Sequence, residues 1–243
     1  MAVAQKIRCR VETILDHGNS VYTLFLKPER LLPRFRPGQF LHLALDEYDP
    51  SSFWPESRVF SIASSPGDRD GLILSYSVRG RFTARMESEL ACGRQVWVKL
   101  PYGDFVIEGT RDVVLLAGGT GITAFTAFIA GLTPEYGHSV YLAYGARSVA
   151  LHTYRDLLDQ QARKVPSLHL FYFAETGCPE TAGDPGGGLT SGCLSVSALW
   201  PRFTDPFTAD YYLSGPPAML KGLSQDLISH GIRPDAVRMD AWE

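Results

Sequence analysis

Residues 112–125 read DVVLLAGGTGITAF, and this stretch decides how the second half of the chain is interpreted. A continuous apolar run ends in glycines and passes into a second apolar segment, which is the pattern of a buried strand, a tight turn and a helix. Gly119, Gly121 and Ala124 match G-x-G-x-x-G/A between that strand and that helix. Glycines there let the backbone approach a pyrophosphate, and the helix start offers free N–H groups. The alternative is a purely structural turn.

The segments that follow continue an alternation of strands and helices. Apolar strand patterns and helical patterns predict a parallel sheet covered on both faces, the Rossmann-like arrangement. The predicted strands lie at residues 113–118, 139–148, 167–173 and 210–214, and the predicted helices at 122–132, 154–164, 195–200 and 218–230. The segment 177–193 is rich in Gly and Pro and predicts a loop whose role stays open.

The first half of the chain has a different texture. Short alternating runs broken by Gly and Pro predict an antiparallel six-stranded β-barrel with one helical insert at 83–90. These runs are residues 6–15, 21–26, 39–45, 59–63, 72–78 and 95–100. The predicted organisation is therefore a barrel domain at 1–108 and an α/β nucleotide-binding domain at 109–243.

Composition excludes several classes of protein. The 243 residues carry a net charge of −3, whereas a generic nucleic-acid binder is usually basic. The chain contains no apolar signal core and no apolar window long enough to span a membrane, so a cytoplasmic protein is expected. Neither the four cysteines nor the six histidines show metal-binding spacing, so we expect no metal and no iron–sulfur centre. The scattered cysteines indicate buried thiols.

Two further positions extend the nucleotide site. The acid that usually binds a ribose 2′-hydroxyl is absent from the end of the strand 139–148, and Arg147 stands there instead. An arginine suits a 2′-phosphate and favours NADPH over NADH, although Arg147 could equally contact solvent or the pyrophosphate. Ser214, Gly215 and Pro216 follow the strand 210–214 and are expected at the same sheet edge as the glycine turn, unless they form an ordinary turn.

Four motifs in order resemble the ferredoxin–NADP reductase family over nearly the whole chain. They are RVFSIASSP at 58–66, LPYGDF at 100–105, GGTGIT at 118–123 and SGPPAM at 214–219, with Ser214 where many members have cysteine. The resemblance implies a flavin on the barrel and NAD(P)H on the second domain. FAD is expected more than FMN.

The resemblance also assigns roles to residues of the barrel. Arg58 is expected to pair with the flavin phosphate, Phe60 to lie against the isoalloxazine ring, and Ser61 to place its hydroxyl near N5. The alternative is that Phe60 belongs to the core and Arg58 pairs with an acid. A second flavin contact is expected from a phosphate-binding helix start, unless Thr83 only caps that helix; its residues are Gly80, Arg81, Phe82 and Thr83.

In the second domain, the resemblance places the pyrophosphate on Gly118, Gly119, Thr120, Gly121, Ile122 and Thr123. Trp242 is expected to cover the flavin and gate hydride transfer, unless the terminus is loose. Ser61, Ser214 and Trp242 are therefore the catalytic candidates, with Asp240 and Glu243 as acids able to relay a proton.

The implied activity is hydride transfer from NAD(P)H to bound FAD, followed by electron delivery to a ferredoxin-like or oxygenase partner. One alternative is an NAD(P)H-dependent reductase of free flavin. Another is a non-catalytic regulatory or assembly subunit, because fold alone does not establish function. The terminal electron acceptor and the oligomeric state stay open.

Overall fold

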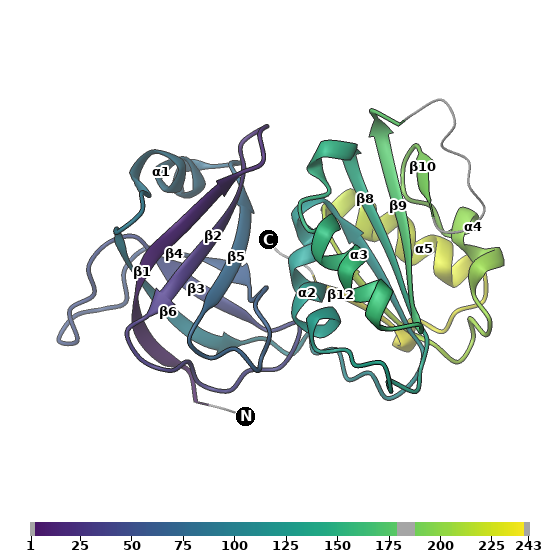
Figure 1. Ribbon diagram of the computed structural model, residues 1–243, viewed down its shortest axis with the longest axis horizontal. Helices are drawn as coiled ribbons and strands as arrows, with labels where there is room; N and C mark the ends of the chain where they lie inside the picture. Colours follow the sequence, from purple (N-terminus) through teal and green to yellow (C-terminus); the bar gives the residue numbers. More distant parts are fainter. Residues whose placement is uncertain (1–2, 179–187, 241–243) are drawn as a thin grey trace. The chain divides into compact units, whose positions relative to one another are not determined.

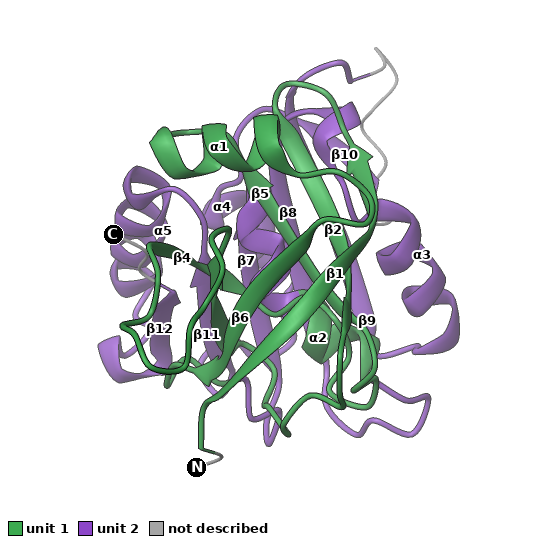
Figure 2. Cartoon of the chain, turned by 90° about the vertical axis from the view of Figure 1, so that its left-hand side faces the viewer, with its two compact units in different colours: residues 1–106, 126–131 green, residues 107–125, 132–243 purple. Residues whose placement is uncertain are grey.

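The computed structural model describes residues 3–178 and 188–240. The chain divides into two compact units (Figure 2). Unit 1 comprises residues 1–106 and 126–131, and unit 2 comprises residues 107–125 and 132–243. Each unit is built around its own sheet.

Unit 1 is an antiparallel barrel of six strands, as the sequence predicts. The strand order is β4-β3-β6-β1-β2-β5. The backbone N–H of Ala63 donates to the carbonyl of Ile73 at 2.9 Å, which links the end of β4 to β5 and nearly closes the sheet. The strands are β1 (Gln5–Asp16), β2 (Val21–Pro28), β3 (Phe40–Ala44), β4 (Ser57–Ser61), β5 (Leu72–Ser77) and β6 (Gln95–Tyr102).

Alternation along the strands fills the barrel. Ile7, Cys9 and Val11 of β1 are buried, while the residues between them are exposed. Helix α1 (Arg81–Glu89) adds Phe82 and Met86 to the same core. The helix begins two residues before the predicted start, because extended Gly80 is its N-cap and the Thr83 side chain binds the turn in front of it.

Unit 2 contains a parallel six-stranded sheet in the order β10-β9-β8-β7-β11-β12, which confirms the predicted parallel arrangement. All residues of β7 are buried, as its continuous apolar run predicts. The strands are β7 (Val113–Gly118), β8 (Val140–Ser148), β9 (Leu168–Thr176), β10 (Leu189–Ser191), β11 (Asp210–Ser214) and β12 (Val237–Asp240).

Helices cover both faces of this sheet. Helices α4 (Val196–Leu199) and α5 (Pro217–Ser229) pack on one face, and α3 (Arg155–Lys164) lies on the other (Figure 1). The helix predicted at 122–132 is α2 (Thr123–Ala130), preceded by a 3₁₀ turn. The 3₁₀ turns are η1 (Gly119–Ile122), η2 (Val149–Leu151), η3 (Trp200–Arg202) and η4 (Pro234–Ala236).

Two short strands escaped the sequence reading. Strand β10 has three residues and lies inside the segment 177–193 that was predicted to be a loop, and β12 has four. Such runs are too short for a periodic pattern to distinguish them from loop. Within the described part of the chain, no helix combines the length and the apolarity that a membrane span requires.

The cysteines differ from one another in exposure. Cys9 is buried, and its burial raises the pKa of the thiol to about 12. Cys92 and Cys193 are exposed, so the prediction of buried thiols is wrong for these two. Cys92 lies in the turn between α1 and β6, and Cys193 lies in the connection after β10, where no alternating pattern directs a side chain inward.

These exposures predict the order of thiol alkylation. Cys92 and Cys193 should react with iodoacetamide in the native protein, whereas Cys9 should react only after unfolding, because a thiolate is scarce at that pKa and buried. Peptide mass spectrometry after native and denatured labelling measures this. Native labelling of Cys9 at the rate of Cys92 would contradict the buried position of β1 in the barrel core.

Candidate functional site

The glycine turn of unit 2 stands at the carboxyl edge of the parallel sheet. β7 ends at Gly118, η1 occupies the next four residues, and α2 starts at Thr123. The Thr123 hydroxyl donates to the carbonyl of Thr120 at 2.8 Å, which fixes the turn in front of the helix. Thus all six residues predicted to hold a pyrophosphate lie in one strand–turn–helix connection, with Ile122 buried.

Two glycines of this turn, Gly119 and Gly121, are needed for different physical reasons. Gly119 has φ +55°, and a Cβ there would meet nothing within 4 Å, so this glycine leaves open space beside the turn. A Cβ on Gly121 would lie 2.5 Å from the carbonyl carbon of Ser214 and 2.7 Å from the backbone nitrogen of Gly215. Gly121 therefore lets two loops of unit 2 touch, a role that the motif alone did not reveal.

Ser214 and Asp240 form a buried pair at the ends of β11 and β12. The two residues are register partners in the sheet, and the Ser214 hydroxyl donates to Asp240 Oδ2 at 3.0 Å. Ser214 is fully buried and Asp240 is 5% exposed. Pro216 is the N-cap of α5, and a Cβ on Gly215 would lie 3.1 Å from Gly118 Cα. The predicted segment 214–216 thus adjoins the glycine turn.

Arg147 extends from the end of β8, the strand next to β7. Gly145, two residues before Arg147 on the same strand, is paired with Gly118 of β7 in the sheet. The Arg147 side chain is exposed, and its carbonyl accepts a hydrogen bond from the Thr176 hydroxyl at 3.0 Å. Arg147 therefore lies at the same sheet edge as the glycine turn, with an exposed side chain.

The His152 ring contacts the backbones of both β8 and β9. Its Nε2 lies 3.1 Å from the carbonyl oxygen of Tyr144 and 3.2 Å from that of Phe173. Burial lowers the pKa of this imidazole, while the carbonyl contacts oppose the shift. The sequence analysis assigned no metal-binding role to His152, and the structure shows that its ring links the backbones of two neighbouring strands.

In unit 1, the residues from the RVFSIASSP motif lie beside the start of α1. The Arg58 guanidinium of β4 lies over the ring of Phe82 at 5.4 Å and donates to the carbonyl of Ser57 at 2.9 Å. Phe60 is half-buried, with its ring edge-on to Tyr76 at 6.3 Å, and Ser61 is 7% exposed. The fold thus brings together the segments 58–61 and 80–83, which were each expected from the sequence to contact the flavin.

The arginines around this place share one carboxylate. Glu56 lies 3.2 Å from Arg81, 3.7 Å from Arg85 and 3.8 Å from Arg58. These groups are partly exposed, so each pair is a weak surface contact and not a major source of stability. The alternative pairing of Arg58 with an acid is therefore present in this structure.

The helix start has its own internal bonds. Thr83 Oγ1 accepts from the backbone N–H of Arg79 at 2.9 Å and from that of Gly80 at 3.1 Å, and it donates to the carbonyl of Gly80. The hydroxyl is thus fully used within the turn, and Phe82 is 2% exposed. What these residues can offer an anion is the backbone N–H groups of the first helical turn. A Cβ on Gly80 would meet nothing within 4 Å, so the approach is open.

Ser64 was missed by the sequence reading. It is 2% exposed, and its hydroxyl oxygen has no hydrogen-bond partner among the described residues. A buried hydroxyl without a partner costs about 1–3 kcal/mol, so native proteins rarely keep one without a reason. Its place three residues after Ser61, in the motif with Arg58, was the available signal. Trp242, the remaining candidate, lies outside the described residues and stays a prediction.

Comparisons with known proteins agree with this geometry. Residues 115–225 match the oxidoreductase NAD-binding domain family. The electron transfer component of toluate 1,2-dioxygenase from Pseudomonas putida is 29% identical over 203 residues, which are 82% of this chain and 56% of that protein. The reductase component of propane 2-monooxygenase from Rhodococcus jostii is 28% identical over 249 residues, which are 98% of this chain and 64% of that protein.

Solved structures share the two-unit fold. The flavohaem-like FAD/NAD-binding domain of nitric oxide dioxygenase from Vibrio cholerae superposes with a TM-score of 0.80 at 18% identity and covers 97% of this chain and 98% of that one. The chain spans 53% and 56% of the length of two curated relatives that it matches. The ordered motifs, the barrel followed by the parallel sheet, and these matches make the chain similar to reductases of the ferredoxin–NADP reductase kind, and residues 115–225 match an oxidoreductase NAD-binding domain.

Proposed function

We propose that the chain is an NAD(P)H-dependent flavoprotein reductase. It holds FAD on unit 1, binds NAD(P)H on unit 2 and delivers electrons to a separate ferredoxin-like or oxygenase protein. The observation that carries the proposal is the glycine turn after β7. Gly119 keeps open space beside a helix start, while its neighbour Gly121 is packed against Ser214. We therefore assign Gly119 to the ligand and Gly121 to packing within the protein. Both lie in the region that matches a NAD-binding domain.

In unit 2, the backbone N–H groups of the turn would bind the pyrophosphate, because a helix start favours an anion. Exposed Arg147 is the group suited to a 2′-phosphate, which supports NADPH over NADH. The Ser214 hydroxyl, held by Asp240 at 3.0 Å, would orient the nicotinamide end of the nucleotide. The Asp240 carboxyl would hold or accept a proton through that hydroxyl.

In unit 1, the residues present fit a flavin dinucleotide. The Arg58 guanidinium would exchange its 3.8 Å contact with Glu56 for a phosphate, a better partner because it accepts two hydrogen bonds. The buried Ser64 hydroxyl would gain the partner that it lacks among the described residues. Half-buried Phe60 offers a ring face to a flat ligand, and Ser61 a hydroxyl next to it.

When bound, the flavin supplies hydride acceptance and release of electrons one or two at a time. We propose that the electrons then pass to a ferredoxin-like or oxygenase partner; the four cysteines of these 243 residues show no cluster spacing for an iron–sulfur centre. Relatives named as the electron transfer component of toluate 1,2-dioxygenase and the reductase component of propane 2-monooxygenase support this direction.

The first test is the absorption spectrum of the purified protein after exhaustive dialysis. We expect a retained flavin band between about 350 and 500 nm that bleaches under anaerobic NADPH faster than under NADH. Arg147→Ala should raise the KM for NADPH and leave that for NADH unchanged, because only NADPH carries a 2′-phosphate. A colourless protein that needs added flavin would indicate a free-flavin reductase, and one that is also inert a non-catalytic subunit; either result would overturn the proposal.

Gly121→Ala should lower the stability of unit 2 by more than about 2 kcal/mol, because the new Cβ meets backbone atoms of Ser214 that cannot rotate away. Gly222→Ala is the matched control. Gly222 lies in α5, and a Cβ there meets nothing within 4 Å, so alanine should stabilise by up to about 1 kcal/mol. Urea unfolding followed by far-UV circular dichroism measures both. An unchanged midpoint for Gly121→Ala would disprove the close approach.

Arg58→Ala should weaken FAD binding about 10- to 100-fold, the usual effect of losing one charge-assisted hydrogen-bonding group. Arg58→Lys should recover part of the affinity, because the charge returns without the guanidinium fork. Arg8→Ala is a control for charge, since Arg8 lies on β1 and pairs with Glu29 at 3.2 Å. Fluorescence titration of the flavin-free protein gives the dissociation constants, and equal constants for wild type and Arg58→Ala would move the phosphate contact elsewhere.

A further inference from the structure

Glu56 lies immediately before β4, in the turn that leads into the Arg58 segment. The indole N–H of Trp54 donates to the Ser57 hydroxyl at 3.0 Å, which bridges the two sides of Glu56. The Glu56 side chain is 33% exposed, so it is held partly against the protein. This short turn therefore presents the carboxylate to the arginines at the start of α1.

The carboxylate contacts three arginines unequally. Arg81 Nη2 donates to both carboxylate oxygens, at 3.2 and 3.3 Å. Arg58 Nη2 lies 3.8 Å from Oε1 and Arg85 Nη1 lies 3.7 Å from Oε2, and both distances are too long for a hydrogen bond. Glu56 is thus a hydrogen-bonding partner of Arg81 and an electrostatic neighbour of the other two.

Arg58 is held in place by contacts other than Glu56. Its guanidinium donates to the carbonyl of Ser57 at 2.9 Å and lies over the ring of Phe82 at 5.4 Å. The hydrogen bond fixes the direction of the group, and the ring supports it by a cation–π contact. Removing the Glu56 carboxylate should therefore leave Arg58 where it is.

Arg85 is also held by other acids, whereas Arg81 is not. Arg85 Nη2 donates to Asp46 at 2.8 Å, and its Nε donates to Glu89 at 2.8 Å. The Arg81 side chain is 82% exposed, and among the described residues it forms an ion pair with Glu56 alone. Arg81 is therefore the cation whose position depends on the Glu56 carboxylate.

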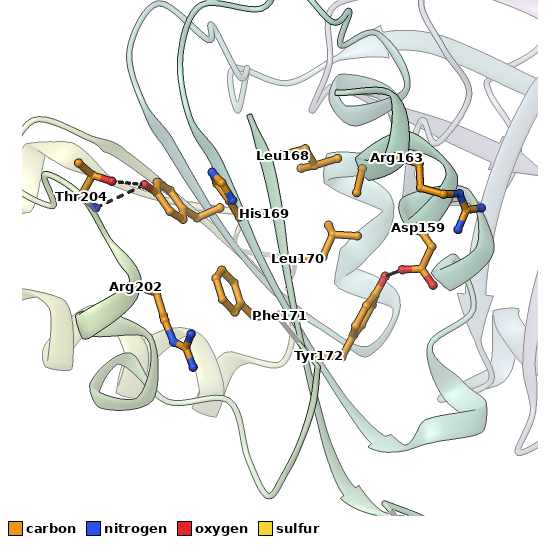
Figure 3. Close-up of a pocket in the computed structure, with 11 residues that line it drawn as sticks. Asp159, Arg163, Leu168, His169, Leu170, Phe171, Tyr172, Arg202 and Thr204 are labelled. Carbon is orange, nitrogen blue, oxygen red and sulfur yellow. Dashed lines mark hydrogen bonds between the residues drawn. The ribbon is translucent and has the colours of Figure 1, made fainter. Parts of the chain in front are cut away.

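A carboxylate of unit 2 shows the opposite arrangement. Asp159 lines a groove of about 580 Å³ along β9 and accepts a hydrogen bond from the Tyr172 hydroxyl at 2.7 Å (Figure 3). Tyr172 is 3% exposed, so loss of Asp159 would take this partner from a buried hydroxyl. The ion pairs and side-chain hydrogen bonds of Glu56 with described residues all go to partly exposed arginines. Glu56 can therefore give up a partner at little cost to the fold.

A carboxylate and a phosphate bind the same guanidinium N–H groups. While Glu56 accepts hydrogen bonds from Arg81, those donors are not available to a phosphate at the start of α1. A phosphate beside Glu56 also meets a like charge. Both effects lower the affinity for a phosphate, and neither opposes the uncharged ring of a flavin.

We propose that Glu56 is a specificity-determining residue that lowers the affinity of unit 1 for the phosphate part of a flavin. It competes for Arg81 and repels the phosphate. This rests on the proposed function, because it requires a flavin phosphate beside Arg58 and Arg81. The consequence is that residue 56 controls the affinity for FAD but not the affinity for riboflavin, which has no phosphate.

The test is Glu56→Gln, measured by fluorescence titration of the flavin-free protein with FAD and with riboflavin. We expect the variant to bind FAD about three- to tenfold more tightly than the wild type at low salt. The gain should shrink as salt rises, because these charges are partly exposed and salt screens them. Riboflavin should bind the variant and the wild type within about twofold of each other.

Glu89→Gln is the matched control. Glu89 lies on α1, 2.8 Å from Arg85 and 3.7 Å from Arg94. The variant removes the same charge from the same group of ion pairs, but among the described residues Glu89 pairs with neither Arg58 nor Arg81. Its affinity for FAD should stay within about twofold of the wild type. Far-UV circular dichroism should be unchanged in both variants.

Three results would overturn the proposal. They are FAD binding by Glu56→Gln that is equal to or weaker than that of the wild type, the same gain for riboflavin as for FAD, and the same gain in Glu89→Gln. The Arg58→Ala titration separates these results from a failure of the proposed function. If Arg58→Ala weakens FAD binding and Glu56→Gln does not tighten it, only the role of Glu56 is wrong. If the wild type binds no flavin, both proposals are wrong.

Discussion

The close approach of two backbones in unit 2 is the constraint on which its site depends. The turn after β7 and the turn after β11 meet where Gly121 lies against the carbonyl group of Ser214, with no room for a side chain. This contact fixes the direction of the glycine turn relative to the buried Ser214–Asp240 pair. The two parallel strands bring the turns to the same edge, and the missing Cβ lets them touch.

The packing explains why two glycines in one motif have opposite surroundings. Position 121 needs glycine because a Cβ would collide with the backbone of Ser214. Position 119 favours glycine because its φ is positive, and a Cβ there would meet no protein atom within 4 Å. A pattern of letters treats the two alike. Only the neighbours in space show which glycine serves the fold and which one serves a ligand.

The sequence predicted the fold where patterns were long. The buried run of β7 and the alternating strands of the barrel follow directly from periodicity, and the barrel followed by a parallel sheet is confirmed. Boundaries shifted where a local side chain decided them, as with Thr83 at the start of α1. Strands β10 and β12 were missed because three or four residues carry no period.

The candidate site was predictable in its motifs but not in its internal bonds. The sequence could name Arg58, Ser61 and Ser214, yet it could not show that Ser64 is buried without a described partner or that Asp240 accepts from Ser214. These properties depend on which strands become neighbours. They are contacts between residues far apart in sequence, and composition and periodicity do not encode them.

The carboxylate of Glu56 has a consequence for how the barrel exists without a ligand. It lies between three guanidiniums, in the position that we propose for a flavin phosphate. Loading the barrel is then an exchange of one anion for another and not the filling of a repulsive, unneutralised cluster of cations. In the proposed reductase, Glu56 therefore keeps Arg58, Arg81 and Arg85 close together when no phosphate lies between them.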